Sequence, residues 1–228
     1  MALDVSTAGQ AQKIVSTLGE SVQFYKVGMQ LYTAEGPPIV HALVEAGKKV
    51  FLDLKYHDIP NTVGAAVREA TQLGASMLTV HAAGGTKMLE AAVEASRPST
   101  GQHVQIVAVT VLTSFDEAAM NAIGIPGKLE DQVIRMASTA LKAGCAGVVS
   151  SAREVATLRA RLGRDFLAVT PGVRPAGADS GDQARVVTPS KAVAAGATHI
   201  VVGRPITEAP DPSRAATEIL NEIRRALV

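Results

Sequence analysis

The chain has 228 residues, enough for one large domain or two small ones and for a hydrophobic core that needs no disulfide or metal. Its 22 basic and 21 acidic residues give a formal net charge of +1, which argues against a surface built to bind nucleic acid. Its single cysteine, Cys145, excludes an internal disulfide framework and a multi-cysteine metal site. No apolar run reaches the ~18 residues of a membrane span and no signal peptide follows Met1, so we expect a cytoplasmic protein with no membrane partner.

Short runs rich in Val, Ile and Leu alternate along the chain with Ala-rich segments of helical length. Several runs show little polar–apolar alternation, which is typical of parallel strands covered on both faces. The eight predicted strands are Ala2–Val5, Gln23–Val27, Lys49–Leu54, Met77–Val80, Val104–Val109, Gly147–Val149, Phe166–Val169 and His199–Val202. Predicted helices include Pro37–Ala46, Val63–Leu73, Thr86–Ala95, Glu130–Ala143 and Ala152–Leu162, and Gly47, Gly74, Gly144 and Gly163 close four of them.

This alternation predicts an α/β fold, specifically a (β/α)8 barrel in which residues 1–228 form a single domain. Eight units of about 28 residues each fit a barrel at the small end of its size range. The alternative is a doubly wound open sheet, which usually carries a glycine-rich phosphate loop after its first strand, and no such loop follows Asp4. The long stretch Pro171–Pro189 predicts a functional loop after the seventh strand.

In such a barrel the catalytic groups lie at the carboxyl ends of the strands. The densest polar cluster at these ends is Asp53-x-Lys55-x-x-Asp58. In a regular strand Asp53 and Lys55 point the same way, and charged groups within an apolar strand are costly unless they are paired. One interpretation is an ion pair that only closes the mouth of the barrel. The other is a lysine held charged between carboxylates, ready to donate a proton.

Two further strand ends carry candidate ligands. Arg204 follows Gly203 after the last predicted strand, where barrels often bind phosphate, although it also fits a plain surface arginine. Arg174 and Gln183 in the long loop are further candidate donors. His81 ends the fourth predicted strand and fits a structural residue better than a catalytic one, while Cys145 fits a small core residue.

The segment Phe51-Leu52-Asp53-Leu54-Lys55-Tyr56-His57-Asp58-Ile59-Pro60-Asn61-Thr62-Val63 closely resembles the signature of the orotidine 5'-phosphate decarboxylase family. Further segments agree with that family in the same order, so the resemblance covers residues 3 to about 207. They are Leu3-Asp4-Val5, Tyr25-Lys26-Val27-Gly28, Thr170-Pro171-Gly172-Val173-Arg174-Pro175, Gly181-Asp182-Gln183 and Val202-Gly203-Arg204-Pro205-Ile206. The D-x-K-x-x-D core alone is less specific, because sugar-phosphate decarboxylases and aldolases of the same suprafamily share it.

The resemblance implies a role for each matching residue. Lys55 resembles the general acid that protonates C6 of the pyrimidine, and Asp53 the carboxylate set against the substrate's own carboxylate. Asp4 and Lys26 resemble the residues that hold the ribose and complete the charged network, and Thr113 a pyrimidine contact. Asp58 and Thr62 resemble residues lent to the partner's site in a homodimer. The remaining matches resemble the nucleotide- and phosphate-binding set, namely Arg174, Gln183, Gly203 and Arg204.

The implied reaction converts orotidine 5'-phosphate (OMP) to UMP and CO2 in pyrimidine biosynthesis, with neither a metal nor an organic cofactor. Two other functions stay open from the residues alone. A sugar-phosphate decarboxylase or aldolase on the same barrel would use Mg²⁺ to stabilise an enediolate. A non-catalytic nucleotide-phosphate binding protein is the third reading, although a pure binder would not need so costly a charge cluster as Lys26, Asp53, Lys55 and Asp58.

Overall fold

Parallel strands surrounded by helices form the body of the molecule in the computed structural model, which describes residues 1–97, 103–175 and 187–227. Within these residues seven strands pair in chain order, each with the next. They are β1 (Phe24–Gly28), β2 (Lys49–Tyr56), β3 (Met77–His81), β4 (Gln105–Val109), β5 (Gly147–Val149), β6 (Leu167–Thr170) and β7 (His199–Ile200). The sequential order excludes the doubly wound alternative, in which the strand order reverses at a switch point.

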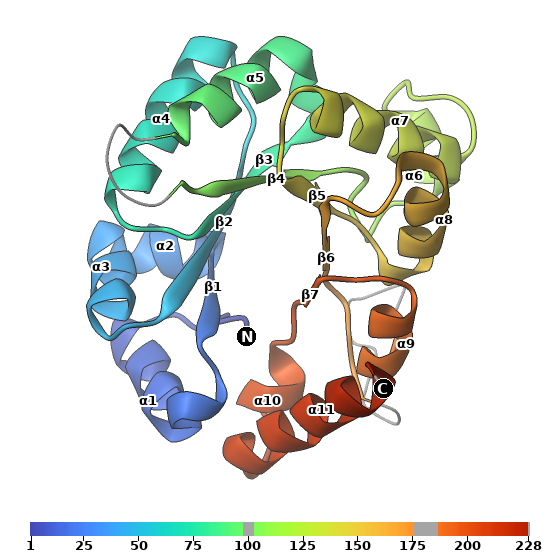
Figure 1. Ribbon diagram of the computed structural model, residues 1–228. Coiled ribbons are helices and arrows are strands. Elements are labelled where there is room, and N and C mark those ends of the chain that lie inside the picture. Colours follow the sequence, from blue (N-terminus) through green and yellow to red (C-terminus); the bar gives the residue numbers. More distant parts are fainter. Residues whose placement is uncertain (98–102, 176–186, 228) are drawn as a thin grey trace.

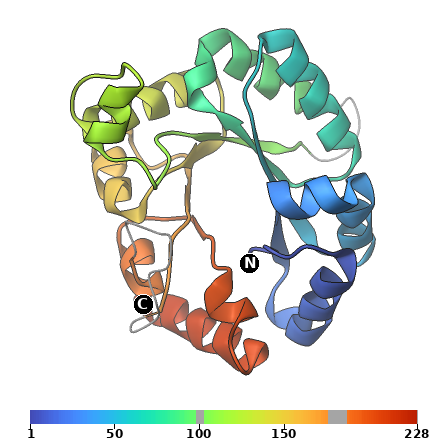
Figure 2. The same cartoon turned by 180° about the vertical axis from the view of Figure 1, so that it is seen from behind.

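The helices lie outside the strands, as Figure 1 and the view from behind in Figure 2 both show. They are α1 (Ala8–Leu18), α2 (Met29–Glu35), α3 (Pro37–Glu45), α4 (Pro60–Gln72), α5 (Gly85–Ala95), α6 (Glu117–Ala122), α7 (Leu129–Lys142), α8 (Ala152–Leu162), α9 (Pro189–Ala194), α10 (Arg204–Thr207) and α11 (Pro212–Ala226), with short 3₁₀ turns at Gly19–Ser21 and Ala82–Gly84. This arrangement is the predicted (β/α) barrel.

The N-terminal segment closes the ring between β7 and β1. The main-chain N–H of Ala2 donates to the carbonyl of Val202 over 2.7 Å, and that of Leu3 donates to the carbonyl of Lys26 over 2.9 Å. The prediction of a full strand at Ala2–Val5 is wrong, because only Ala2 makes a bridge, to Lys26. On the β1 side the carbonyl of Met1 also accepts from the N–H of Lys26 over 2.8 Å, and α1 begins shortly afterwards at Ala8.

Two packed layers explain why the strand sequences are apolar without alternation. Inside the ring, a buried cluster is built from one residue of each of several strands, namely Phe51, Met77, Val107 and Val169. Between the strands and the helices lies a larger core that takes the neighbouring residues, for example Leu52, Leu78, Ala108 and Ala168. Because both faces of each strand are covered, residues facing either way are hydrophobic.

Local sequence signals set the helix ends. Helix α8 starts with a capping box, in which Glu154 Oε2 accepts from the N–H of Ser151 over 3.0 Å. The four glycines predicted to close helices all have positive φ, which other residues rarely adopt, namely Gly47, Gly74, Gly144 and Gly163.

Cys145 follows the last turn of α7 and is buried in the outer core, as predicted, and burial raises the pKa of its thiol to about 12.

The close approach of β5 and β6 at Gly147 supports a stability prediction. A Cβ on Gly147 would overlap the main-chain carbonyl of Leu167 on the neighbouring strand. We expect Gly147→Ala to lower the free energy of unfolding by about 3 kcal/mol, because the rigid strand pair has to separate to admit a methyl group. Chemical denaturation monitored by circular dichroism measures the change.

Gly9 provides the matched control for this variant. A Cβ there meets nothing within 4 Å, and the residue lies in α1. Gly9→Ala should leave stability unchanged or raise it by up to about 1 kcal/mol, because alanine favours the helix. Equal stabilities of the two variants would contradict the proposed crowding at Gly147.

Candidate active site

A pocket of about 260 Å³ opens at the carboxyl ends of the strands. Most of the residues predicted to form the site line it, and they come from segments far apart in the sequence. They are Asp4, Lys26, Asp53, Lys55, Thr113, Arg174, Gly203 and Arg204. The carboxyl ends of the parallel strands thus bring together the charged residues of the N-terminal segment, β1 and β2 and the basic residues that follow β6 and β7.

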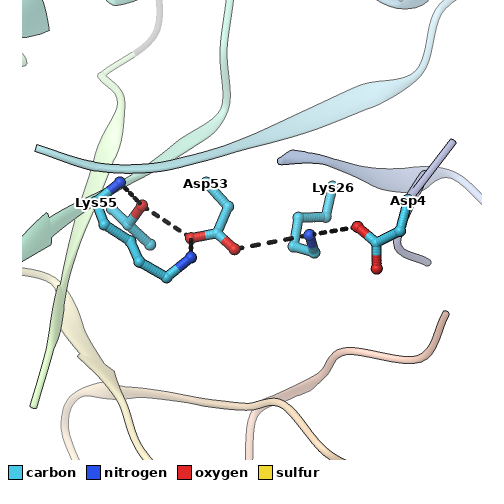
Figure 3. Close-up of polar contacts among 5 residues, drawn as sticks. Asp4, Lys26, Asp53 and Lys55 are labelled. Atoms are coloured by element: carbon cyan, nitrogen blue, oxygen red, sulfur yellow. Dashed lines mark hydrogen bonds and ion pairs between the residues drawn. The ribbon is translucent and has the colours of Figure 1, made fainter. Parts of the chain in front are cut away.

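Four charged side chains form a row along one wall of this pocket (Figure 3). The ammonium of Lys26 lies 3.0 Å from Asp4 Oδ1 and 3.7 Å from Asp53 Oδ2. The ammonium of Lys55 lies 2.9 Å from the other oxygen of Asp53. Each lysine thus faces a carboxylate, and Asp53 joins the two lysines. We call these four residues the charged row.

The row is shielded from solvent to different degrees along its length. The side chains of Lys26 and Asp53 are 12% and 14% exposed, whereas that of Asp4 is 52% exposed. Lys55 is intermediate, at 28%. Charge–charge interactions strengthen as water is excluded, so the contacts of Asp53 are less screened than the contact of Asp4 with Lys26.

The strand is not regular where Lys55 enters the site. Leu52 pairs with Leu78 and Tyr56 with Val80, so three residues of β2 lie opposite a single residue of β3. Lys55 has φ of 53°, and no other non-glycine residue in the described ranges has a positive φ. The expectation that Asp53 and Lys55 meet because of strand alternation is therefore wrong in its reason. They meet because a bulge turns Lys55 back toward Asp53.

Thr79 is a functional residue that the sequence analysis missed. It is the β3 residue opposite the bulge, it is fully buried, and its hydroxyl contacts both Asp53 and the main chain of Lys55. The sequence does mark this position, since Thr79 is the only polar residue within the apolar run from Met77 to Val80. Threonine is common in strands, which is why this signal did not stand out.

Basic side chains and main-chain groups suited to an anion also line the pocket, in the segments that follow β6 and β7. Arg174 is buried, and Arg204 starts the short helix α10 directly after Gly203. A Cβ on Gly203 would lie 3.2 Å from Asp4 Oδ2, so glycine here allows the N-terminal segment to pack against the end of the last strand. Thr113 lines the pocket after β4.

Three predicted residues are not brought to this pocket within the described chain. Asp58 and Thr62 are exposed at the start of α4 and do not line it, and Asp58 Oδ1 accepts from the N–H of Ile59 over 2.6 Å. Gln183 lies outside the described residues, as does most of the predicted loop 171–189. Its described ends are joined by a bridge between Val173 and Val187.

His57 and His81 stack on each other beside the charged row. Their ring centroids are 5.3 Å apart with an interplanar angle of 19°. His81 Nδ1 accepts from the N–H of Ala83 over 3.3 Å. Burial, followed by the charges of His57 and Lys55, lowers the pKa of His81, so its ring is neutral at pH 7. The stacking on His57 and the hydrogen bond from Ala83 fit the prediction that His81 is a structural residue.

Comparison with known proteins identifies the family of the chain. Residues 1–219 match the model of the "Orotidine 5'-phosphate decarboxylase / HUMPS" family. The chain belongs to this family. It is 52% identical over 218 residues to an orotidine 5'-phosphate decarboxylase of Anaeromyxobacter sp. strain K, covering 96% of this chain and 94% of that protein. It is 47% identical to one of Heliobacterium modesticaldum, covering 100% and 96% of the two chains.

Solved structures in this family share the fold of the chain. The crystal structure of orotidine 5'-phosphate decarboxylase from Lactobacillus acidophilus superposes with a TM-score of 0.87 at 40% identity, covering 97% of this chain and 96% of the other. That of the Pyrococcus horikoshii enzyme gives a TM-score of 0.77 at 29% identity, covering 98% and 97%. In the part of the chain that the structure describes, no helix is long and apolar enough to cross a membrane.

Proposed function

We propose that this chain decarboxylates OMP to UMP and CO2, with residues 1–228 acting as one catalytic domain. The observation that carries the proposal is the charged row, because Asp53 and Lys55 converge at 2.9 Å on the wall of a pocket that Arg174 and Arg204 also line. A ligand that carries both a phosphate and a carboxylate fits these charged groups.

The reaction requires electrostatic stabilisation of the carbanion that forms at C6 of the pyrimidine. When CO2 leaves C6 of the pyrimidine, the electron pair of the broken C–C bond stays on C6, and no adjacent carbonyl can accept it. A fixed ammonium beside C6 stabilises this carbanion as it forms. In our proposal the Lys55 ammonium does so and then transfers a proton from Nζ to C6, which gives UMP.

The other members of the charged row prepare this step. Asp53 pairs with Lys55 and, in our proposal, faces the carboxylate of the substrate, where two like charges at ~4 Å and an effective dielectric of ~20 repel by about 4 kcal/mol. Lys26 contacts the second oxygen of Asp53. In our proposal Lys26 and Asp4 bind the ribose hydroxyls. Of the two effects, stabilisation of the carbanion by Lys55 contributes more to the rate than repulsion of the substrate carboxylate by Asp53, because it lowers the activation barrier directly.

The phosphate contributes binding energy at a distance from the reacting carbon. We assign it to Arg204, the main chain at Gly203, and Arg174, with Gln183 of the 171–189 loop as a further donor and Thr113 on the pyrimidine side. Energy released there serves to align the ring over Lys55.

The assay that tests the function follows the loss of the orotate-type absorbance of OMP in the presence of EDTA. Turnover in EDTA supports the proposal. Loss of activity in EDTA, restored by Mg²⁺, would instead favour the sugar-phosphate decarboxylase or aldolase reading. A folded protein that binds UMP but leaves OMP intact would point to the nucleotide-binding reading.

We further propose that the active unit is a homodimer in which Asp58 and Thr62 complete the site of the partner subunit. Both side chains are exposed on the segment that leads into α4 and lie outside their own pocket. Between them Ile59 is 67% exposed, and contact with a second copy would remove this apolar side chain from water.

Complementation between two inactive variants tests the shared site. Lys55→Ala and Asp58→Ala are each expected to be inactive alone. After subunits exchange, half of the dimers are mixed and each has one intact site, so activity should return to about a quarter of the unmodified level. A monomer with full activity in sedimentation, or no recovery in a mixture shown to contain mixed dimers, would contradict the shared site.

A further inference from the structure

Thr79 makes two hydrogen bonds from one buried oxygen. Its hydroxyl accepts from the main-chain N–H of Lys55 over 2.8 Å and lies 3.0 Å from Asp53 Oδ1. An amide N–H can only donate, so the hydroxyl must accept from Lys55, and its single proton is directed to the carboxylate. The direction of both bonds is therefore determined by the chemistry of the groups.

The bulge explains why this hydroxyl is needed. Three residues of β2 lie opposite Thr79, so the ladder of main-chain hydrogen bonds between β2 and β3 is interrupted at Lys55. The side chain of Thr79 supplies the acceptor that a main-chain carbonyl would supply in a regular ladder. Lys55 also has φ of 53°, a left-handed conformation that an L-residue keeps only when its surroundings hold it.

We propose that Thr79 is a positioning residue for the proton-donating lysine. It holds the main chain of Lys55 and the carboxylate of Asp53 at the same time, and thereby sets the direction from which the Lys55 ammonium reaches the substrate. This inference rests on the proposed function, in which Lys55 protonates C6. It assigns to a buried residue of β3 a part of the geometry that the charged row alone does not determine.

The placement of Thr79 predicts which kinetic constant it affects. Thr79 is fully buried and is not among the residues that line the pocket, so it makes no contact with a bound nucleotide. Its loss should misplace Lys55 in the chemical step and leave nucleotide binding intact. A general weakening of the fold would instead lower the fraction of active protein and the melting temperature together.

The test compares Thr79→Val, which has the same shape without the hydroxyl, with Thr79→Ser, which keeps the hydroxyl. We expect kcat for OMP to fall by about 10- to 100-fold in Thr79→Val, with the Kd for UMP unchanged, because small displacements of a catalytic group have effects of this size. Thr79→Ser should recover most of the loss. If Thr79→Val does not fold, Thr79→Ser and Thr79→Ala form a second pair that differs by the hydroxyl alone.

Thr110→Val is the matched control. Thr110 is equally buried, follows β4, and donates its hydroxyl to the carbonyl of Val149 over 3.0 Å rather than to a member of the charged row. A kcat for Thr79→Val equal to that of Thr110→Val would overturn the proposal, as would an equal loss in the serine and alanine variants. Absence of turnover by the unmodified chain would count against the proposed function itself.

Discussion

Replacing Lys55 by alanine is expected to lower kcat for OMP by about 10⁴-fold, because the variant loses both the proton donor and the cation beside the forming carbanion. Binding of UMP should remain, since the groups assigned to the phosphate are untouched. The absorbance assay measures kcat, and calorimetric titration with UMP measures binding. The fold should survive, because the Lys55 side chain is 28% exposed and Asp53 keeps its contacts with Lys26 and Thr79.

Two further variants make this result interpretable. Lys142→Ala removes an exposed lysine from the last turn of α7, at the other end of the barrel, and should retain full activity. Lys55→Gly removes the same ammonium but relieves the left-handed backbone, so it should be as inactive as Lys55→Ala and at least as stable. Substantial turnover by either Lys55 variant would show that another group donates the proton.

Asp53→Asn is expected to lower kcat by about 10³-fold and to change the preference of the site for its ligands. Asparagine keeps the shape of the side chain and its contact with Thr79, but it removes the negative charge that lies between Lys26 and Lys55. If Asp53 opposes the carboxylate of OMP with the repulsion of about 4 kcal/mol given above, the variant should bind OMP up to about 10³-fold more tightly relative to UMP, which lacks that carboxylate.

The measurement compares two dissociation constants in the same variant. Because turnover is slow, the KM of Asp53→Asn for OMP equals its dissociation constant, and inhibition by UMP gives the second value. Asp165→Asn, an exposed carboxylate that precedes β6, is the control and should behave as the unmodified chain. An unchanged ratio of the two constants, together with a lower kcat, would mean that Asp53 acts only by holding Lys55.

The fold and the charged row could be predicted from the sequence because they depend on simple regularities. Apolar runs bounded by glycine-closed helices locate the strands, and Gly147–Val149 agrees residue by residue with the strand found. The rule that barrel chemistry lies at the carboxyl ends of strands then brings Asp4, Lys26 and Asp53 to one pocket without any knowledge of their distances.

The features that escaped prediction depend on tertiary context. A bulge has no local signature at Lys55, because the irregular register exists only in relation to the partner strand β3. Thr79 becomes functional only as a consequence of that bulge. The segment Ala2–Val5 has the composition of a strand but forms one bridge, since pairing length depends on where the next helix begins.

The closure of the ring by the N-terminal segment has a consequence for the order of folding. Each pairing from β1 to β7 joins strands that are neighbours in the chain, so the sheet can form step by step as the chain is synthesised. The bond from Ala2 to Val202 instead joins opposite parts of the sequence, and the same segment carries Asp4 to Lys26. Closure of the ring is therefore a late event that waits for the last strand, whereas the contact between Asp4 and Lys26 joins segments only 22 residues apart and can form early.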